Sequence, residues 1–280
     1  MLIRSMTHAD ILAGLALCRA AHWNQTVRDW EQFLSLNPDG ARVAERDGRV
    51  VATVTTVNYE ERLGWIAMVL VDPAERRQGL GTIMLATGLE LLEPLPSVGL
   101  DATQAGYPIY VKRGFRETYR LARMERREWA PVSLPGGPRV RPLTPEDWTT
   151  VRAWDLHAYG ADRSGMLEWL HAGAPQYAWV AEDAGRLVGY VLGRSGFAFE
   201  HLGPIVARDE QAAAALVAAC IADHRAPFIV DALLHSPGWC AWLNGAGFRE
   251  QRPFIRMHRG GRGAMGRPHE QFASIGPEFG

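Results

Sequence analysis

The chain has 280 residues, of which 47% are hydrophobic and 22% charged, and its formal net charge is −1 at pH 7. This composition is typical of a folded protein with a sizeable core and one or two domains. The near-neutral balance excludes a bulk basic surface for nucleic acid or an anionic membrane, and no apolar run reaches membrane-spanning length. The first ten residues mix acidic, basic and polar side chains, unlike a signal peptide, so we expect a cytoplasmic protein.

In the first half, residue patterns predict a mixed sheet flanked by helices. Asp47-Gly48 is typical of a hairpin turn between two of its strands. The predicted strands lie near 2–6, 41–46, 49–57, 63–71, 97–101 and 115–126, and the helices near 8–21, 26–36, 80–92 and 106–113.

Residues 129–138 are rich in proline and glycine and predict a linker, after which the pattern of the first half returns. Each half opens with a short strand, a threonine suited to cap a helix, and acidic residues in its first turn. Each half also closes with Gly-Phe-Arg-Glu. We therefore predict a duplicated domain, with one copy at 1–128, a second at 139–259 and a tail at 260–280 that docks through its apolar side chains. Strands of the second copy are expected near 139–141, 177–182, 187–194, 200–206, 228–231 and 248–257.

The most informative segment is 69–92, which predicts a strand, a loop with two glycines, and an amphipathic helix. This order directs backbone N–H groups and the helix dipole at one place, which suits a phosphate or diphosphate. Gly79 and Gly81 allow the backbone to approach an anion, and Arg76 and Arg77 add charged donors. The spacing matches neither the P-loop nor the dinucleotide-binding pattern.

This loop resembles the acetyl-CoA loop of the GCN5-related N-acetyltransferase (GNAT) superfamily, Q/R-x-x-G-x-G/A, with Arg76 in first place. Nearly the whole chain resembles tandem-domain, YitH-like bacterial acetyltransferases. That resemblance is carried by Trp23-Asn-Gln-Thr26, Asp29-Trp30, Val69-Leu-Val-Asp-Pro73, His201-Leu-Gly-Pro204 and Gly276-Pro277-Glu278-Phe279-Gly280. It implies an α/β (α+β) fold of two GNAT domains, each a mixed, mostly antiparallel twisted sheet flanked by helices.

The resemblance also implies acetyl-CoA as cosubstrate. Its pantetheine arm would follow a bulged strand, and its diphosphate would lie on the loop. The strand residues are Met68, Val69, Leu70 and Val71, and the loop residues are Arg76, Arg77, Gln78, Gly79, Leu80, Gly81 and Thr82.

Tyr110 stands four residues before Gly114-Phe115, where the family often has the acid that protonates the leaving thiolate. A phenol has a suitable pKa range for this role, although a tyrosine that only packs its ring fits the pattern as well. The general base stays open among Glu60, Glu61 and His22, and the alternative is that water relays deprotonate the amine without a base.

The connection between the first two helices is expected to overlie the acceptor cleft, with Trp23, Asn24 and Asp29 as substrate residues. The alternative is that Thr26 caps a helix, Trp23 belongs to the core and Asp29 is an ordinary acidic residue of the first turn.

The second copy lacks a glycine between Ile205 and Leu216 and has Asp209 and Glu210 where phosphate would lie. Leu243 stands in the place of Tyr110. We expect this copy to be degenerate and to wall the acceptor cleft. Its possible contacts with the acceptor are Asp155, His157, Asp162, Arg163 and His235.

The predicted function is direct acetyl transfer from acetyl-CoA to a primary amine of a small molecule, by a monomer or homodimer without nucleic-acid or membrane partners. The three cysteines, Cys18, Cys220 and Cys240, lie outside the loop and lack metal-ligand spacing, so neither an acetyl-cysteine intermediate nor a metal is expected. The alternatives are an acyl-CoA sensor without turnover, a protein or peptide acetyltransferase, and a longer acyl donor.

Overall fold

The computed structural model describes residues 1–132, 136–261 and 266–280. The predicted strands and helices are confirmed to within a few residues. The first half comprises β1 (Leu2–Ser5), α1 (Ile11–Ala20), α2 (Val27–Leu36), β2 (Ala41–Arg46), β3 (Arg49–Tyr59), β4 (Leu63–Val71), α3 (Leu80–Leu91), β5 (Ser97–Ala102), α4 (Tyr107–Lys112) and β6 (Arg116–Arg126). The second comprises β7 (Arg139–Pro142), α5 (Trp148–Tyr159), α6 (Ser164–Gly173), β8 (Trp179–Asp183), β9 (Arg186–Arg194), β10 (Glu200–Ala207), α7 (Glu210–Ile221), β11 (Phe228–Leu233), α8 (Pro237–Gly245), β12 (Arg249–Gly260) and β13 (Gln271–Ala273).

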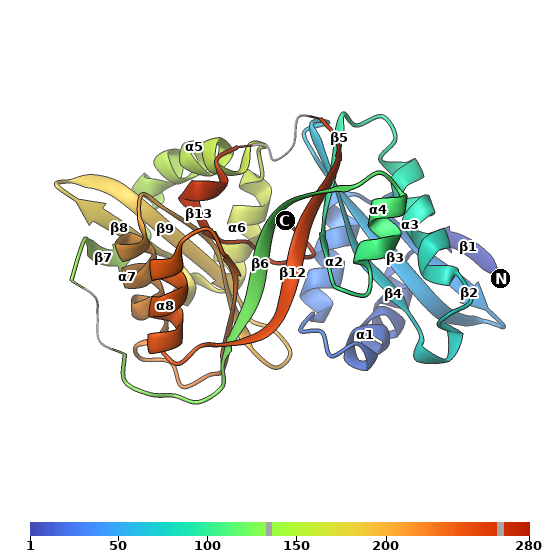
Figure 1. Cartoon of the computed structure of the whole chain (residues 1–280), viewed down its shortest axis with the longest axis horizontal. Coiled ribbons are helices and arrows are strands. Elements are labelled where there is room, and N and C mark those ends of the chain that lie inside the picture. The colour runs from blue at the N-terminus through green and yellow to red at the C-terminus, as the bar shows by residue number, and fades with distance from the viewer. Residues whose placement is uncertain (133–135, 262–265) are drawn as a thin grey trace.

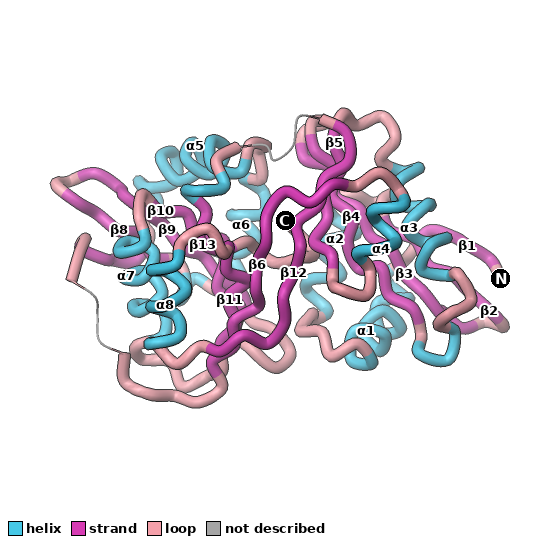
Figure 2. The backbone as a smooth tube through the Cα atoms, in the orientation of Figure 1, coloured by secondary structure: helices cyan, strands magenta, loops and turns pink. Residues whose placement is uncertain are grey.

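The two halves share one continuous sheet of mostly antiparallel strands (Figures 1 and 2). They are joined because their long final strands are exchanged. β6 of the first half pairs with β11 of the second, and β12 of the second half pairs with β5 of the first. β6 and β12 also pair with each other. The exchange places second-half residues beside the first-half strands, which the predicted division at 128 and 139 does not anticipate.

Helices cover both faces of each half. In the first half, α1 and α2 pack on one face through Trp30 and Phe33, and α3 packs on the other through Met84 and Leu85. In the second half, α5 and α6 join the same core as α1 and α2, whereas α7 and α8 cover the opposite face. One apolar core therefore runs between the halves. None of the helices described here is long and apolar enough to cross a membrane.

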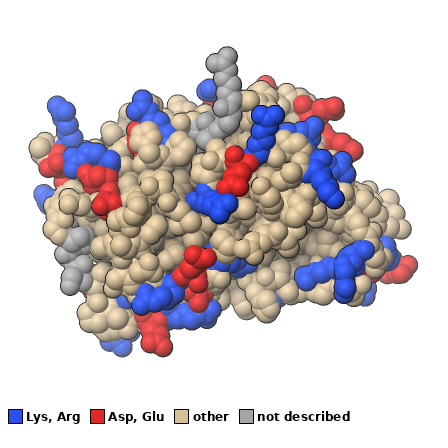
Figure 3. All heavy atoms as spheres, viewed as in Figure 1, with Lys and Arg blue, Asp and Glu red and all other residues tan. Residues whose placement is uncertain are grey.

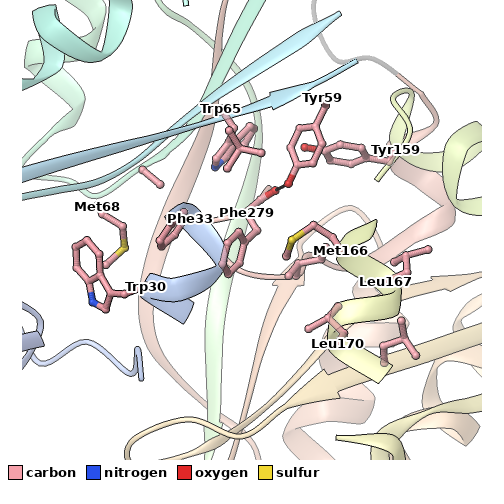
Figure 4. Packing of buried hydrophobic residues seen from close by; sticks show 14 of the residues in the cluster. Trp30, Phe33, Tyr59, Trp65, Met68, Tyr159, Met166, Leu167, Leu170 and Phe279 are labelled. Atoms are coloured by element: carbon pink, nitrogen blue, oxygen red, sulfur yellow. Dashed lines mark hydrogen bonds between the residues drawn. The ribbon is translucent and has the colours of Figure 1, made fainter. Parts of the chain in front are cut away.

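The tail docks, as predicted, and it does so at two places. β13 inserts between β10 and β11, and Phe279 is fully buried between the halves. The Phe279 ring stacks on Phe33 with centroids 4.6 Å apart, and the Phe279 carbonyl accepts a hydrogen bond of 2.6 Å from the Tyr59 hydroxyl (Figure 4). The Pro277 carbonyl accepts from Trp65 Nε1 at 2.9 Å. These contacts seal the tail against the first-half sheet.

The duplication is visible in two matching ion pairs at the starts of the halves. Asp10 and Asp147 each complete a capping box, with Thr7 and Thr144 respectively. Arg4 donates two hydrogen bonds of 2.8 Å to Asp10, and Arg141 donates to Asp147 at 2.6 and 2.8 Å. These arginines lower the pKa of both carboxyl groups to about 2.

Stability is therefore expected to fall as the pH drops from about 4 towards 2. The folded-state pKa of Asp147 lies below the ordinary aspartate pKa of 3.8, so its contribution to stability is complete above pH 3.8 and is lost as the pH falls through about 2. Asp147→Asn should lower the free energy of unfolding at pH 7 by about 1–2 kcal/mol, measured by urea denaturation. The matched control is Asp183→Asn, whose partner Arg208 is half-exposed, and it should change stability by less than about 0.5 kcal/mol. Equal effects of the two substitutions would contradict this assignment.

Candidate active site

A bulge in β4 opens the first-half sheet. Thr53 faces Leu70 and Thr55 faces Ala67, so β4 carries one extra residue relative to β3. At the bulge Met68 adopts a φ of 51°, and its carbonyl accepts a hydrogen bond of 2.7 Å from Thr53 Oγ1. On its other edge, β4 pairs with β5 only through Gly64 and Trp65 before the strands separate. The backbone from Ile66 onward is thus left without a strand partner on that side.

A pocket with about 600 Å³ of empty space lies where these strands separate. Met68, Val69, Tyr110 and Trp23, all predicted as site residues, line it, whereas Leu70 and Val71 do not. The remaining lining residues come from the connection between α1 and α2, from β4 and β5 with the residue after β5, from the exchanged strands and from the tail: Gln25, Ile66, Ala67, Leu100, Asp101, Thr103, Arg123, Arg252, Phe254, Pro277 and Glu278. We call this space the inner pocket.

The glycine loop follows the end of β4 and opens α3. Gly79 is the N-cap, with a φ of 80° that suits glycine, and a Cβ on it would meet nothing within 4 Å. A Cβ on Gly81 would meet only Val71 Cγ2, at 3.7 Å. Leu80 is buried and anchors the helix, and the Thr82 N–H donates to the Gly79 carbonyl at 3.0 Å. The first turn therefore presents an uncrowded backbone.

Arg76, Arg77 and Gln78, directly before α3, are exposed. Arg76 Nε donates to the Val71 carbonyl at 3.3 Å, which holds this side chain near the strand end. Arg77 has a φ of 64°, and Gln78 lies between Glu75 and Arg46, 3.3 Å from each. Open space, a helix N-terminus and two arginines fit a diphosphate.

Tyr110 projects from α4 into the inner pocket. Its ring lies over Gly106, where a Cβ would be only 2.7 Å from the ring, and it packs against Phe115 at a centroid distance of 6.0 Å. Burial raises the pKa of Tyr110 to about 12. The phenol is therefore protonated at neutral pH, which is the state needed in a proton donor.

Asn24 and Asp29, expected to meet the acceptor, do not line the inner pocket, and Asn24 lines a separate hollow outside it. The Asn24 amide donates to the Phe199 carbonyl at 2.9 Å and accepts from the Ala198 N–H at 2.9 Å. Asp29 is buried, accepts from the Thr26 N–H at 2.6 Å, and lies 3.1 Å from Arg194 Nε. Thr26 and Asp29 form the capping box of α2, as the alternative interpretation held.

The candidate general bases and the candidate acceptor contacts of the second half also lie outside the inner pocket. Glu60 and Glu61 do not line the inner pocket, and His22 lines a separate hollow outside it. The five second-half residues proposed as acceptor contacts lie elsewhere. Asp155 pairs with Arg163 at 2.9 Å, Asp162 accepts from the Ser164 N–H, His235 contacts the Gln271 carbonyl, and His157 is exposed.

Besides Asp101 of β5, three charged residues that line the inner pocket were not predicted as site residues: Arg123, Arg252 and Glu278. Arg123 forms two hydrogen bonds of 2.8 Å with the buried Asp231. Burial opposes ionisation of Glu278, but the contacting Arg194 guanidinium outweighs it and holds the pKa of Glu278 below its usual range. Strand exchange and tail docking bring these groups to the site, and no local spacing in the sequence signals either event.

In the second half, the two places that correspond to the inner pocket and to the glycine loop are filled by the chain itself. There, β10 and β11 separate after pairing through residues 200–202, and β13 fills the gap between them. At the start of α7, the Asp209 carboxylate accepts a hydrogen bond of 2.9 Å from the Ala212 N–H. Trp239 of α8 holds β13 by donating to the Phe272 carbonyl at 3.0 Å. A strand and a carboxylate of the protein itself thus stand where the first half has open space.

Comparison with known proteins identifies this architecture. Residues 15–115 match the Acetyltransferase (GNAT) family and residues 151–273 match an Acetyltransferase (GNAT) domain. The chain therefore belongs to the GNAT family and carries two such domains, and it is an acyltransferase. This confirms the family, the fold class and the tandem organisation expected from the sequence.

Two relatives match this chain over most of the length of both proteins. The chain is 28% identical over 228 residues to "Uncharacterized N-acetyltransferase YitH" of Bacillus subtilis, covering 80% of this chain and 79% of the relative. It is 25% identical to "Holothin acyltransferase" of a Pseudoalteromonas species, covering 93% and 88%. A solved structure of a putative acetyltransferase from Pyrococcus horikoshii superposes with a TM-score of 0.82 at 22% identity, covering 100% and 95%, and shows the shared fold.

Proposed function

We propose that the first domain transfers an acetyl group from acetyl-CoA to a primary amine of a small molecule, and that the second domain does not bind acetyl-CoA. The observation that carries the proposal is the opened bulge of β4, flanked by the glycine loop and by Tyr110. Met68 and Val69 would lie along the pantetheine arm, and the first turn of α3 with Arg76 and Arg77 would hold the diphosphate.

In this reaction the amine nitrogen attacks the thioester carbonyl and forms a C–N bond, and the C–S bond breaks. The Tyr110 hydroxyl supplies a proton to the departing sulfur, and the proton lost by the amine passes to water. No cysteine lines the inner pocket, which supports direct transfer. Unpaired backbone N–H groups at a bulge are suited to stabilise the oxyanion.

A small acceptor is supported by the walls of the inner pocket. Trp23, Phe254 and the tail residues Pro277 and Glu278 enclose its acceptor side. A folded protein substrate would need an open groove for an extended segment. The relative named for holothin is likewise named for a small molecule.

The test is release of free CoA thiol from acetyl-CoA with a panel of primary amines, with the product identified by mass spectrometry. The matched control is the N,N-dimethyl form of each amine, which cannot form a stable amide. Amine-dependent release with primary amines alone is expected. Tight binding without turnover would favour a sensor, and acetylation confined to protein lysines would favour the peptide alternative. The same assay with longer acyl-CoAs determines the donor.

A further inference from the structure

Three of the four charged residues that line the inner pocket contact an oppositely charged side chain, and the fourth does not. Asp101 pairs with Arg256, Arg123 pairs with Asp231, and Glu278 contacts Arg194, which it shares with Asp29. Arg252 has no carboxylate within 4 Å among the described residues, and its guanidinium donates only to the Gln251 side-chain oxygen and the His22 carbonyl, both at 3.2 Å. A half-buried cation without a counter-charge is costly unless a ligand supplies one.

Arg252 also forms the boundary between two spaces. It lines both the inner pocket and a neighbouring outer hollow with about 1170 Å³ of empty space. Trp23 and Arg123 line both as well. A molecule entering from the outer hollow thus passes Arg252 before it reaches the bulge of β4.

The outer hollow is itself basic. Arg19, Arg123, Arg127 and Arg252 line it, and no described aspartate or glutamate does. Arg123 pairs with Asp231 and Arg127 with Glu125, which leaves Arg19 and Arg252 as the two arginines without such a pair among the described residues. Arg19 is held over the Phe197 ring at 3.5 Å and donates to the carbonyls of Trp23 and Gln25. Like Arg252, it contacts no carboxylate within 4 Å in the part of the chain that the structure describes. Elsewhere, the visible face of the molecule shows acidic and basic side chains close to one another (Figure 3). The positive hollow favours anions over cations.

We propose that the acceptor is a small amino acid-like molecule whose carboxylate binds Arg252 while its amine reaches the β4 bulge. This inference rests on the proposed function and names its substrate class. A planar guanidinium matches a carboxylate in charge and in bidentate geometry. The buried Asp29, expected to be a substrate residue, contacts Arg194 and lies outside the pocket, so it supplies no negative charge for a cationic acceptor.

The test compares amino acids with their carboxamides, such as glycine with glycinamide, β-alanine with β-alaninamide and phenylalanine with phenylalaninamide. Each pair keeps the amine and removes the negative charge. The wild-type enzyme should acetylate at least one acid with a kcat/KM that is roughly 10- to 100-fold above that of its amide. Arg252→Gln should remove this preference by raising KM for the acid, with the amide and the affinity for acetyl-CoA unchanged.

The substitution should preserve the fold, because no buried carboxylate loses its partner. Arg249→Gln is the matched control: it removes the same charge from the same strand, at an exposed residue outside the pocket, and should leave the preference intact. Three results would overturn the carboxylate proposal. The wild type could use acids and amides equally, it could turn over neither series, or Arg252→Gln and Arg249→Gln could lose the preference for acids equally. Failure of acetyl-CoA to bind the wild-type protein would instead overturn the proposed function.

Discussion

Gly81→Glu is expected to abolish binding of acetyl-CoA while leaving the protein folded. The new side chain fits, because a Cβ at Gly81 makes only an ordinary contact of 3.7 Å with Val71. A glutamate in the first turn of α3 is also favourable for the helix dipole. Its carboxylate would, however, lie where the diphosphate is proposed to bind. Juxtaposed like charges cost several kcal/mol, so the affinity should fall by more than ~100-fold.

The second domain offers a matched control for this variant. Gln211 is the second residue of α7, as Gly81 is of α3, and it is exposed. Gln211→Glu should leave the affinity for acetyl-CoA unchanged, measured by calorimetric titration of both variants beside the wild type. Retention of wild-type affinity by Gly81→Glu would show that the diphosphate lies elsewhere.

Tyr110→Phe is expected to lower kcat by roughly 100-fold or more, the scale of general acid catalysis, with KM for acetyl-CoA nearly unchanged. The substitution removes only the hydroxyl, and the ring keeps its packing on Gly106 and Phe115. The raised pKa of Tyr110, about 12, adds a pH criterion. Because the acid form persists below that value, the wild-type kcat should show no fall attributable to Tyr110 between pH 7 and 10.

Tyr107→Phe serves as the control, because Tyr107 is half-buried on the same helix and does not line the inner pocket. It should retain wild-type kcat. If Tyr110→Phe behaved like this control in steady-state assays of CoA release, another group or water would have to protonate the thiolate.

The parts of the fold that depend on local sequence were predictable. The hairpin at Asp47-Gly48 was predicted from two residues, and both adopt the positive φ angles, 52° and 73°, that such a turn requires. The strand, glycine loop and helix around α3 likewise follow from composition and periodicity within about 24 residues. The caps at Thr7 and Thr144 could be predicted as well, because a capping threonine and its acidic partner lie within one helical turn.

The features of the fold and of the site that were not predicted depend on contacts between segments far apart in the chain. Nothing local distinguishes β12 from a strand that stays within its own half, so neither the exchange nor Arg252 could be placed at the site. The contact between Asp29 and Arg194 could not be predicted, because the two residues lie far apart in the chain. β13 is only three residues long and pairs in the gap left by two other strands, so periodicity cannot reveal it. Glu278 belongs to the segment that carried the family resemblance, but its position at the pocket follows only from docking of the tail.

The two halves are unequal, because the first domain is open at the β4 bulge and the second is filled by β13 and Asp209. Calorimetric titration of the full chain with acetyl-CoA, with free CoA for comparison, measures whether this difference leaves one binding site or two. We predict one binding site per chain, lost in Gly81→Glu and kept in Gln211→Glu. Two sites per chain would mean that β13 and Asp209 leave the second domain competent, and the absence of binding by the folded protein would contradict the assignment of the first.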